Sequence, residues 1–323
     1  LFEISELVRD YLDITFDGNY TGQSVWVQLV HTAYRADNFV LFTNTGTNIA
    51  FDGYWYFEES QTASPSTFIS NRELFVLEDN TFRIPIYTSN NPTVVFYKDG
   101  EVIASETFSS STDSVNQIKY VSIYGDSVNW DTFQERVIED NSDYESNACL
   151  QSFFDNYSIG AVDKITVSDS SGIQTIKVNV IEECKYEPKK VTFINKFGAL
   201  QDMYFFKKSK ENLTIKKESY KSNIISAFGQ YSKTNHVNRD FNVIGSESIT
   251  LSSGYLSEEY NEVFKQLMLS EKVWVTNILE TGEQVLPINV KTSSIAYKTS
   301  VNDKLVDYTI EFDKSFDTIN NIR

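Results

Sequence analysis

The sequence predicts a mainly β protein with two β-sandwich-like domains, the second of which also carries one amphipathic helix. Three observations lead to this fold class. Apolar residues alternate with polar ones through much of the chain, which is the pattern of half-buried strands. Turn sequences recur between these runs, and a helical period occurs only near residues 257–269. With 41% apolar and 14% aromatic residues, the chain is expected to be ordered and globular.

An abrupt change in net charge marks the expected domain boundary. Residues 1–184 hold nine lysines and arginines against 28 aspartates and glutamates, a net charge of −19, whereas residues 185–323 hold 19 against 17, a net charge of +2. A chain of 323 residues also exceeds most single cores. We therefore expect an acidic β-rich domain over 1–183, with a subdivision near 125–160 left open, and a β-sandwich over 184–323.

The first half is expected to consist of short strands and hairpins. The runs 39–42 and 74–77 have the length and composition of buried strands. Asp99-Gly100 lies between two apolar runs, which predicts a type I′ hairpin. A second hairpin is expected around 169–172. The acidic stretch 129–158 is only weakly periodic, and we expect an excursion there with one helical turn.

In the second half, one helix is expected among further hairpins. An apolar stripe recurs at helical spacing, and Ser257 before it has the residue type of an N-cap. A hairpin follows over 273–288, and a single strand with one wet face is expected over 306–312. The stripe consists of Tyr260, Val263, Phe264, Leu267 and Met268.

No sequence motif for catalysis, metal binding or nucleotide binding is present. The chain has two histidines, His31 and His236, and lacks G-x-S-x-G, H-E-x-x-H, C-x-x-C, G-x-G-x-x-G and P-loop patterns. We therefore expect no enzyme, no catalytic residues, no metal and no cofactor. A pair of carboxylates for glycoside hydrolysis stays open, because such a pair meets in space and not at a fixed spacing.

Two further features have structural interpretations. The acidic cluster Asp140, Asp143 and Glu145 lacks the glycine and spacing of a calcium loop, and a solvated loop is expected instead. Cys149 and Cys184 are expected to be ordinary thiols. No run of about 18 apolar residues and no secretory leader is visible, so membrane insertion is not expected; a short segment before Leu1 is left open.

Two local stretches are candidate sites. Consecutive aromatics at Tyr54, Trp55 and Tyr56 place side chains on both faces of a strand, where an exposed pair would stack on a sugar or enter a partner. The alternative is that both faces are covered. The second stretch contains Asn195, Phe197 and Gly198. Asn and Gly tolerate left-handed backbone, so we interpret this stretch as a structural corner between two strands.

The second half also contains a basic stretch. Its members are Lys207, Lys208, Lys210, Lys216 and Lys217. Three interpretations stay open. The lysines form a solvated strand face, bind phosphate, or contact an acidic neighbour, including the first half of another copy. The acidic first half is expected to repel nucleic acid, so sequence-specific nucleic-acid binding is not expected.

The run Val191–Gly198, followed by Asp202–Phe206, resembles a signature of virion structural proteins from tailed phages, notably those of Bacteroidetes hosts. The segments Leu7–Tyr11 and Lys272–Val275 are also similar. The resemblance covers the second half well and the first half loosely. It carries no catalytic residues, and the second half is also similar in outline to tail-tube-type domains.

This resemblance implies a tail or baseplate component, made in the host cytoplasm and located in the virion tail. Its partners would be copies of itself and other tail proteins, assembled as rings around the tail axis. Whether the acidic half lines a DNA channel or is simply solvated surface stays open. The alternative function is a carbohydrate-binding or host-adhesion module that uses the aromatics at 54–56.

Overall fold

The structure is a computed structural model that describes residues 5–12, 14–20, 24–35, 40–54, 56, 66–77, 81–108, 118–124, 162–170, 172–183, 185–225, 228–279, 282–297 and 305–318. The acidic stretch 129–158, including Asp140, Asp143 and Glu145, lies outside the described residues, as do Cys149 and Cys184.

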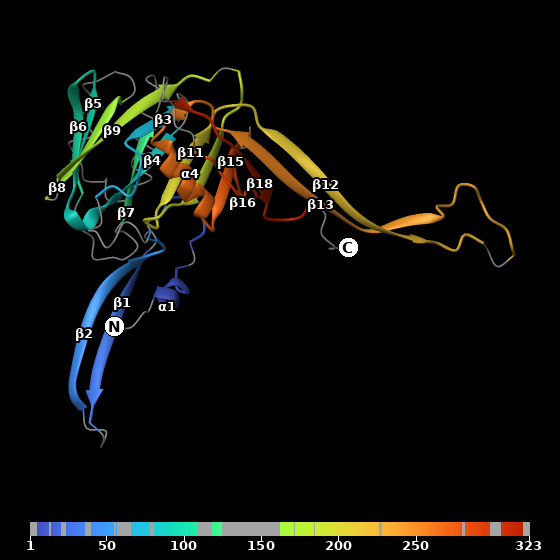
Figure 1. The fold of residues 1–323 in the computed structure, drawn as a ribbon, viewed down its shortest axis with the longest axis horizontal. Helices are drawn as coiled ribbons and strands as arrows, with labels where there is room; N and C mark the ends of the chain where they lie inside the picture. Colours follow the sequence, from blue (N-terminus) through green and yellow to red (C-terminus); the bar gives the residue numbers. More distant parts are fainter. Residues whose placement is uncertain are drawn as a thin grey trace.

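A β-rich body carries two hairpins that stand out from it in different directions (Figure 1). The prediction of a mainly β fold is confirmed, and α4 (Tyr260–Leu269) is the one helix of seven or more residues in the described chain. The remaining helical pieces are the short α1 (Ser5–Arg9) and the 3₁₀ turn η2 (Thr88–Asn90). None of the described helices is long and apolar enough to span a bilayer.

The first half builds a five-stranded sheet in the order β3-β9-β8-β5-β6. The predicted hairpin at Asp99-Gly100 is confirmed, since both residues have positive φ, at 50° and 86°, and join the paired strands β5 and β6. The hairpin at 169–172 is also confirmed. The strands are β3 (Glu73–Leu77), β5 (Thr93–Lys98), β6 (Glu101–Thr107), β8 (Lys164–Asp169) and β9 (Gly172–Ile181), with a separate pair of β4 (Thr81–Tyr87) and β7 (Ile118–Tyr124).

The second half builds a seven-stranded sheet in the order β11-β10-β15-β16-β18-β13-β12. The predicted hairpin over 273–288 is confirmed by the pairing of β15 with β16. A two-stranded pair, β14 (Leu256–Ser257) and β17 (Leu305–Val306), accompanies it. The sheet strands are β10 (Lys189–Ile194), β11 (Leu200–Phe205), β12 (Lys210–Lys221), β13 (Asn238–Ser252), β15 (Val273–Leu279), β16 (Gly282–Val290) and β18 (Thr309–Lys314).

The predicted helix is present, but its predicted cap is wrong. α4 begins at Tyr260 after Glu259, and no side chain caps it. Ser257 lies in β14, opposite Leu305 of β17. Ser257 therefore lies in a strand, two residues before the N-cap position at Glu259, and does not cap the helix. The predicted stripe faces the core, where four of its members are buried and Met268 is half-buried.

The prediction of a single strand over 306–312 is also wrong, because the strand is interrupted at Asp307-Tyr308. Residues before the break pair with β14, and residues after it pair with β13 and β16. Tyr308 is buried at the break, and its hydroxyl donates to Asn261 Oδ1 at 2.6 Å. Alternation alone predicts which side chains face inward, but it does not reveal a change of partner strand.

The core continues across the predicted domain boundary. The five-stranded sheet ends at Ile181 and the seven-stranded sheet begins at Lys189, so the boundary near residue 184 coincides with a change of sheet. However, one hydrophobic cluster includes buried side chains from both halves, such as Leu74, Phe205 and Phe312. The division into two domains stays a prediction.

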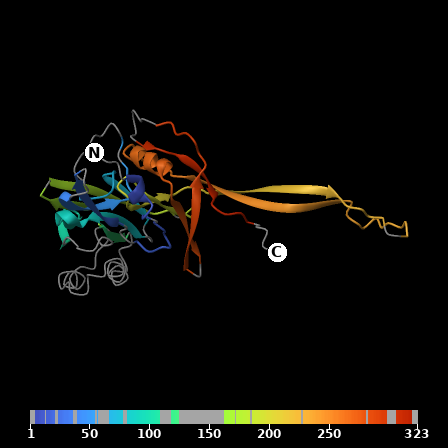
Figure 2. The same cartoon turned by 90° about the horizontal axis from the view of Figure 1, so that it is seen from below.

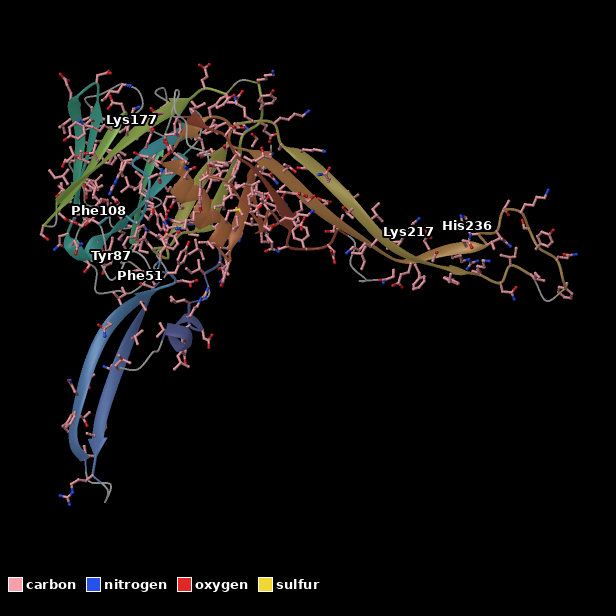
Figure 3. All side chains as sticks on the ribbon, viewed as in Figure 1. Phe51, Tyr87, Phe108, Lys177, Lys217 and His236 are labelled. Atoms are coloured by element: carbon pink, nitrogen blue, oxygen red, sulfur yellow. The ribbon has the colours of Figure 1, made fainter. Side chains whose placement is uncertain are left out.

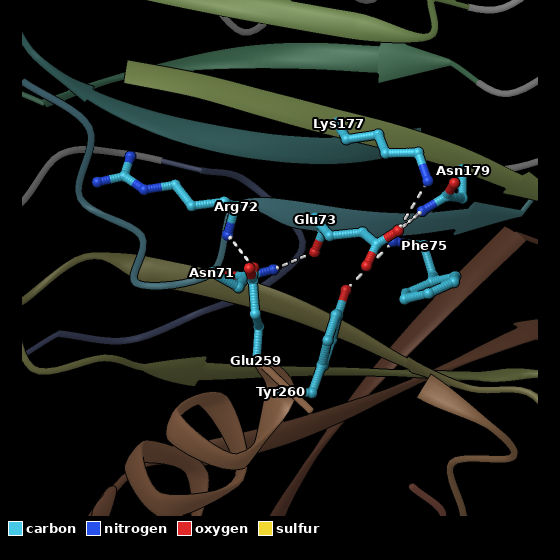
Figure 4. Close-up of polar contacts among 8 residues, drawn as sticks. All are labelled: Asn71, Arg72, Glu73, Phe75, Lys177, Asn179, Glu259 and Tyr260. Carbon is cyan, nitrogen blue, oxygen red and sulfur yellow. Dashed lines mark hydrogen bonds and ion pairs between the residues drawn. The ribbon is translucent and has the colours of Figure 1, made fainter. Parts of the chain in front are cut away.

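Polar contacts also join β3 of the first half to α4 of the second (Figure 4). The Arg72 amide donates to Glu259 Oε2 at 3.1 Å, and the Phe75 amide donates to the Tyr260 hydroxyl at 3.2 Å. Tyr260 is fully enclosed, and its burial raises the pKa of its hydroxyl. These contacts join the start of the helix to the first half of the chain.

Candidate assembly surface

The first projecting hairpin, which we call arm 1, consists of β1 (Ser24–Tyr34) and β2 (Val40–Phe51). The strands pair along their whole length, and neither contains an Asp, Glu, Lys or Arg. Proteins usually protect exposed strand edges with charges, and an isolated two-stranded hairpin is marginally stable in water. Arm 1 therefore has the chemistry of a strand pair that another surface covers.

The prediction of a buried strand at 39–42 is wrong in its burial for the residues that the structure describes, because Val40 and Phe42 belong to the tip-side part of arm 1. Val40 and Phe42 are 45% and 59% exposed. An apolar run predicts side chains that favour burial, but it does not say whether the burial occurs within one copy of the chain.

One face of arm 1 is mixed in character. In the register of the hairpin it carries the apolar residues Val27, Leu29, Ala33 and Phe42. The same face also carries the uncharged residues His31, Asn44, Gly46 and Asn48. Val27, Leu29 and Ala33 are half-buried, and Phe42 is exposed. This face continues at its foot into a groove that Val27, Leu29 and Asn48 help to line.

This groove has a volume of about 710 Å³ and lies between arm 1, α1 and the end of α4. Its charged edge is held by Arg9, whose Nε lies 3.3 Å from Asp52 Oδ1 and whose guanidinium donates to Glu271 Oε2 at 2.6 Å. Its apolar lining includes Val8, Leu12, Val27, Leu29, Ile49 and Leu269.

The foot of arm 1 is anchored by aromatic packing. Phe51 ends β2 and meets Phe68 and Tyr87 edge-on, with ring centroids 5.5 and 5.6 Å apart. Figure 3 labels Phe51 and Tyr87 where the arm joins the body. Phe68 also stacks on Phe197, with ring centroids 5.4 Å apart. The predicted corner therefore contacts the same aromatic residue that anchors the foot of the arm.

The stretch predicted as a corner forms the turn between β10 and β11. Asn195 is completely buried, and its Oδ1 accepts from the amides of Phe197 (3.0 Å) and Ala199 (3.2 Å). Its Nδ2 donates to the Phe68 carbonyl at 2.5 Å and to Gln201 Oε1 at 2.9 Å. One side chain therefore satisfies the turn and connects it to a neighbouring segment.

Two glycines let this turn press against the end of β2. Gly198 has φ +77°, and a Cβ there would lie 2.8 Å from the Asp52 nitrogen. A Cβ on Gly53 would lie 2.5 Å from the Lys196 carbonyl oxygen, which also accepts from the Tyr54 amide at 2.7 Å. The corner thus holds the base of arm 1, a contact between distant residues that no sequence spacing indicated.

A buried polar cluster fixes the N-terminal segment to the same sheet. The Tyr20 hydroxyl donates to Asp202 Oδ1 at 2.6 Å, and Thr192 Oγ1 donates to the same oxygen at 2.7 Å. Burial, together with the Asp202 charge, raises the pKa of Tyr20 well above its ordinary value. The Arg83 guanidinium lies 4.1 Å from the centre of the Tyr20 ring.

The second projecting hairpin, which we call arm 2, is the distal part of β12 and β13 with the tip between them, residues 213–241 (Figure 2). It carries five lysines and arginines against two acids, a net charge of +3, which leaves −20 on the rest of the chain. Phe228 and Tyr231 at its tip are 90% and 70% exposed. Figure 3 labels Lys217 and His236 on this arm, far from the body.

The predicted basic stretch is divided by the structure. Lys216 and Lys217 are exposed on arm 2, where Lys217 Nζ lies 2.8 Å from Asp240 Oδ2. Lys207 lies at the body and donates to Glu183 at 3.0 Å. The lysines therefore do not form one site, and the distal ones belong to an arm.

The predicted aromatic platform is only partly described, because Trp55 lies outside the described residues. Tyr54 and Tyr56 meet edge-on at 5.7 Å, and Lys265 Nζ lies 3.4 Å from the centre of the Tyr56 ring. A cation on this ring face occupies a position that a sugar would use for stacking. Burial raises the pKa of Tyr56, with Tyr54 and Glu262 nearby.

Among the described residues, no group of three or more His, Cys, Asp or Glu side chains is placed to hold a metal ion. The residues predicted as sites are thus a corner and an aromatic pair. Tyr54, Tyr56 and Asn195 line the groove, but neither the groove nor the projection of the two arms was predicted from sequence. The sequence signals for the arms are the absence of charge from residues 24–34 and 40–51 and the excess of positive charge in 213–241.

No protein-family model and no curated protein matches this chain. Among solved structures, it is similar to a chain from the tail of an empty GTA particle with C6 symmetry, at 14% identity and a TM-score of 0.27. The match covers 41% of this chain and 94% of that chain. A similarity of this size does not assign the chain to a family.

Proposed function

We propose that this protein is a structural component of a phage tail or baseplate, which works by multimer assembly and not by catalysis. Its partners are copies of itself and other tail proteins. The observation that carries the proposal is the pair of arms, one uncharged and one cationic, that project from an acidic body.

The arms favour assembly on physical grounds. Phe42, Phe228 and Tyr231 are exposed, and covering such apolar area stabilises a complex by about 25 cal/mol per Å² before the costs of association. The two arms differ in charge and lie on different sides of the body (Figure 1). An arm that contacts a different surface on its neighbour makes a head-to-tail contact, and such contacts generate closed rings or filaments.

Immunogold labelling of intact tailed particles tests this proposal. Antibodies against the chain should decorate the tail, and electron micrographs of the purified chain should show rings. Labelling confined to the capsid, or the absence of the chain from purified particles, would contradict the proposal.

Carbohydrate binding through Tyr54, Trp55 and Tyr56 is the alternative prediction, and no contact of the described residues favours it. A glycan array tests it directly, since binding that is lost in Trp55→Ala would favour adhesion over assembly.

A further inference from the structure

We propose that the groove at the foot of arm 1 is the receptor for the tip of arm 2 from a second copy of this chain. This inference rests on the proposed assembly function and names the two surfaces that meet. The ligand is thus a cationic hairpin with an aromatic tip, and its binding site is lined by α1, arm 1 and the end of α4.

The groove has the shape and lining of a site for an apolar plug. Its volume of about 710 Å³ lies within the range of ligand pockets, about 300–1,000 Å³. Leu269 on its edge is 54% exposed, and the half-buried Leu29 lies on the same face of arm 1 as Ala33 and Phe42. A guest that fills the groove and extends along this face would also cover Phe42.

Arm 2 supplies a matching guest. Phe228 and Tyr231 are the largest apolar side chains near its tip, and both are mostly exposed to solvent. Tyrosine is enriched among the residues that contribute most to binding at protein interfaces, and phenylalanine is enriched in interfaces relative to the rest of the surface. In arm 2 they stand on a hairpin whose strand β12 alone, at about 3.3 Å per residue, spans about 40 Å.

Charge favours contact between arm 2 and the body of another copy. Arm 2 carries +3, whereas the rest of the chain carries −20. The groove itself is lined by two acids and two bases, Asp52, Glu271, Arg9 and Lys272, so apolar packing and not charge distinguishes it from the rest of the body. Two copies of arm 2 would repel one another, while arm 2 and the body attract. Such complementarity steers association and discourages wrong partners.

The arm belongs to another copy because it points away from its own groove. Arm 1 and arm 2 leave the body in different directions, and the tip of arm 2 is the part of the chain farthest from α1 along the long axis (Figures 1 and 2). Each copy therefore offers one tip and one groove, which is the arrangement that a head-to-tail assembly requires.

Complementation between two variants of the full chain tests the pairing. The tip variant Phe228→Asp/Tyr231→Asp removes the plug, and Leu29→Lys places a charge in the groove. We expect each variant alone to weaken self-association, measured by sedimentation velocity, by at least about tenfold. Mixed in equal amounts, they should form a one-to-one complex that grows no further, because one intact tip and one intact groove remain.

Matched controls separate this from charge and folding effects. Gln230→Asp/Thr234→Asp makes the same charge change near the tip, and Gln28→Lys places the same charge on the opposite face of β1. Both should associate more tightly than the corresponding test variant. Circular dichroism melting should show that all four variants are folded, since the substituted side chains are exposed or half-buried.

Three outcomes would overturn the inference. If the wild-type chain associates but the mixed variants do not complement, or if the controls weaken association as strongly as the test variants, the tip binds elsewhere and the assembly function still stands. If the wild-type chain stays monomeric at every concentration, the inference and the proposed assembly both fail.

Discussion

At the scale of single residues, two glycines allow the corner to pack closely against the end of β2 at the foot of arm 1. Gly198 has a left-handed backbone and lies against Asp52 and Phe51, and Gly53 lies against Lys196. A methyl group at either position would meet backbone atoms rather than a mobile side chain. The corner therefore acts on arm 1 by steric fit.

Replacing Gly198 with alanine should destabilise the chain by about 2 to 4 kcal/mol, because strain from the positive φ adds to the clash with Asp52. Gly100→Ala is the control, since it has φ +86° but no atom within 4 Å of the added Cβ. It should cost only about 1 kcal/mol. Urea denaturation of both variants measures the difference, and equal losses would contradict the steric account.

Buried tyrosines predict a loss of stability in alkali. Burial raises the pKa of Tyr20, Tyr120 and Tyr260 above the ordinary value. As pH passes about 10, these hydroxyls ionise in the unfolded chain but stay protonated in the folded chain. The folded state then binds more protons, so the free energy of unfolding falls as pH rises.

Urea midpoints measured from pH 8 to pH 11 should therefore decrease, and Tyr120→Phe should decrease less steeply over the same range. A midpoint that stays constant to pH 11 in the wild-type chain would show that these hydroxyls are not held protonated by burial.

At the scale of elements, arm 1 has little support from the body. Its strands pair with each other, and the described side chains that pack on the body lie at its foot, near Phe51. By contrast, β10 and β11 are buried along their whole length. Local stability follows such differences in packing.

Amide hydrogen exchange of the monomer should therefore be fast in residues 40–47 and slow in residues 189–205. On assembly, we expect residues 40–47 to become protected. If arm 1 exchanges as slowly as β10 in the monomer, or gains no protection in the multimer, it is not the covered surface.

The elements also show how far sequence reasoning reached. Asp99-Gly100 located a hairpin because few residues adopt positive φ, and the stripe from Tyr260 to Leu267 located α4 because its period is helical. Neither signal depends on distant residues. The parallel pairing of β3 with β9 does, as does the contact of Gly198 with Asp52.

The arms were missed for the same physical reason. Alternation indicates that two faces of a strand differ, but it does not say which molecule covers the apolar one. The run 39–42 was therefore predicted to be buried within the chain, although Val40 and Phe42 are exposed in one copy. Of the candidate site, the sequence singled out the corner, the aromatics Tyr54 and Tyr56 that line the groove, and the lysines Lys216 and Lys217 of arm 2.

At the scale of the whole molecule, the charge is distributed unevenly enough to favour ordered assembly. A body with −20 repels other bodies, while an arm with +3 attracts them. High salt should therefore weaken the arm contact more than it weakens the apolar packing, because exposed charges are screened beyond about 10 Å at 0.1 M.

The most direct test of assembly through the arms is sedimentation velocity over a concentration series, on the full chain and on a chain in which Asn-Gly replaces residues 216–244 between the paired Ile215 and Gly245. We predict that the full chain forms multimers, whereas the shortened chain stays monomeric with an unchanged melting temperature. A full chain that remains monomeric, or a shortened chain that associates equally well, would contradict the account.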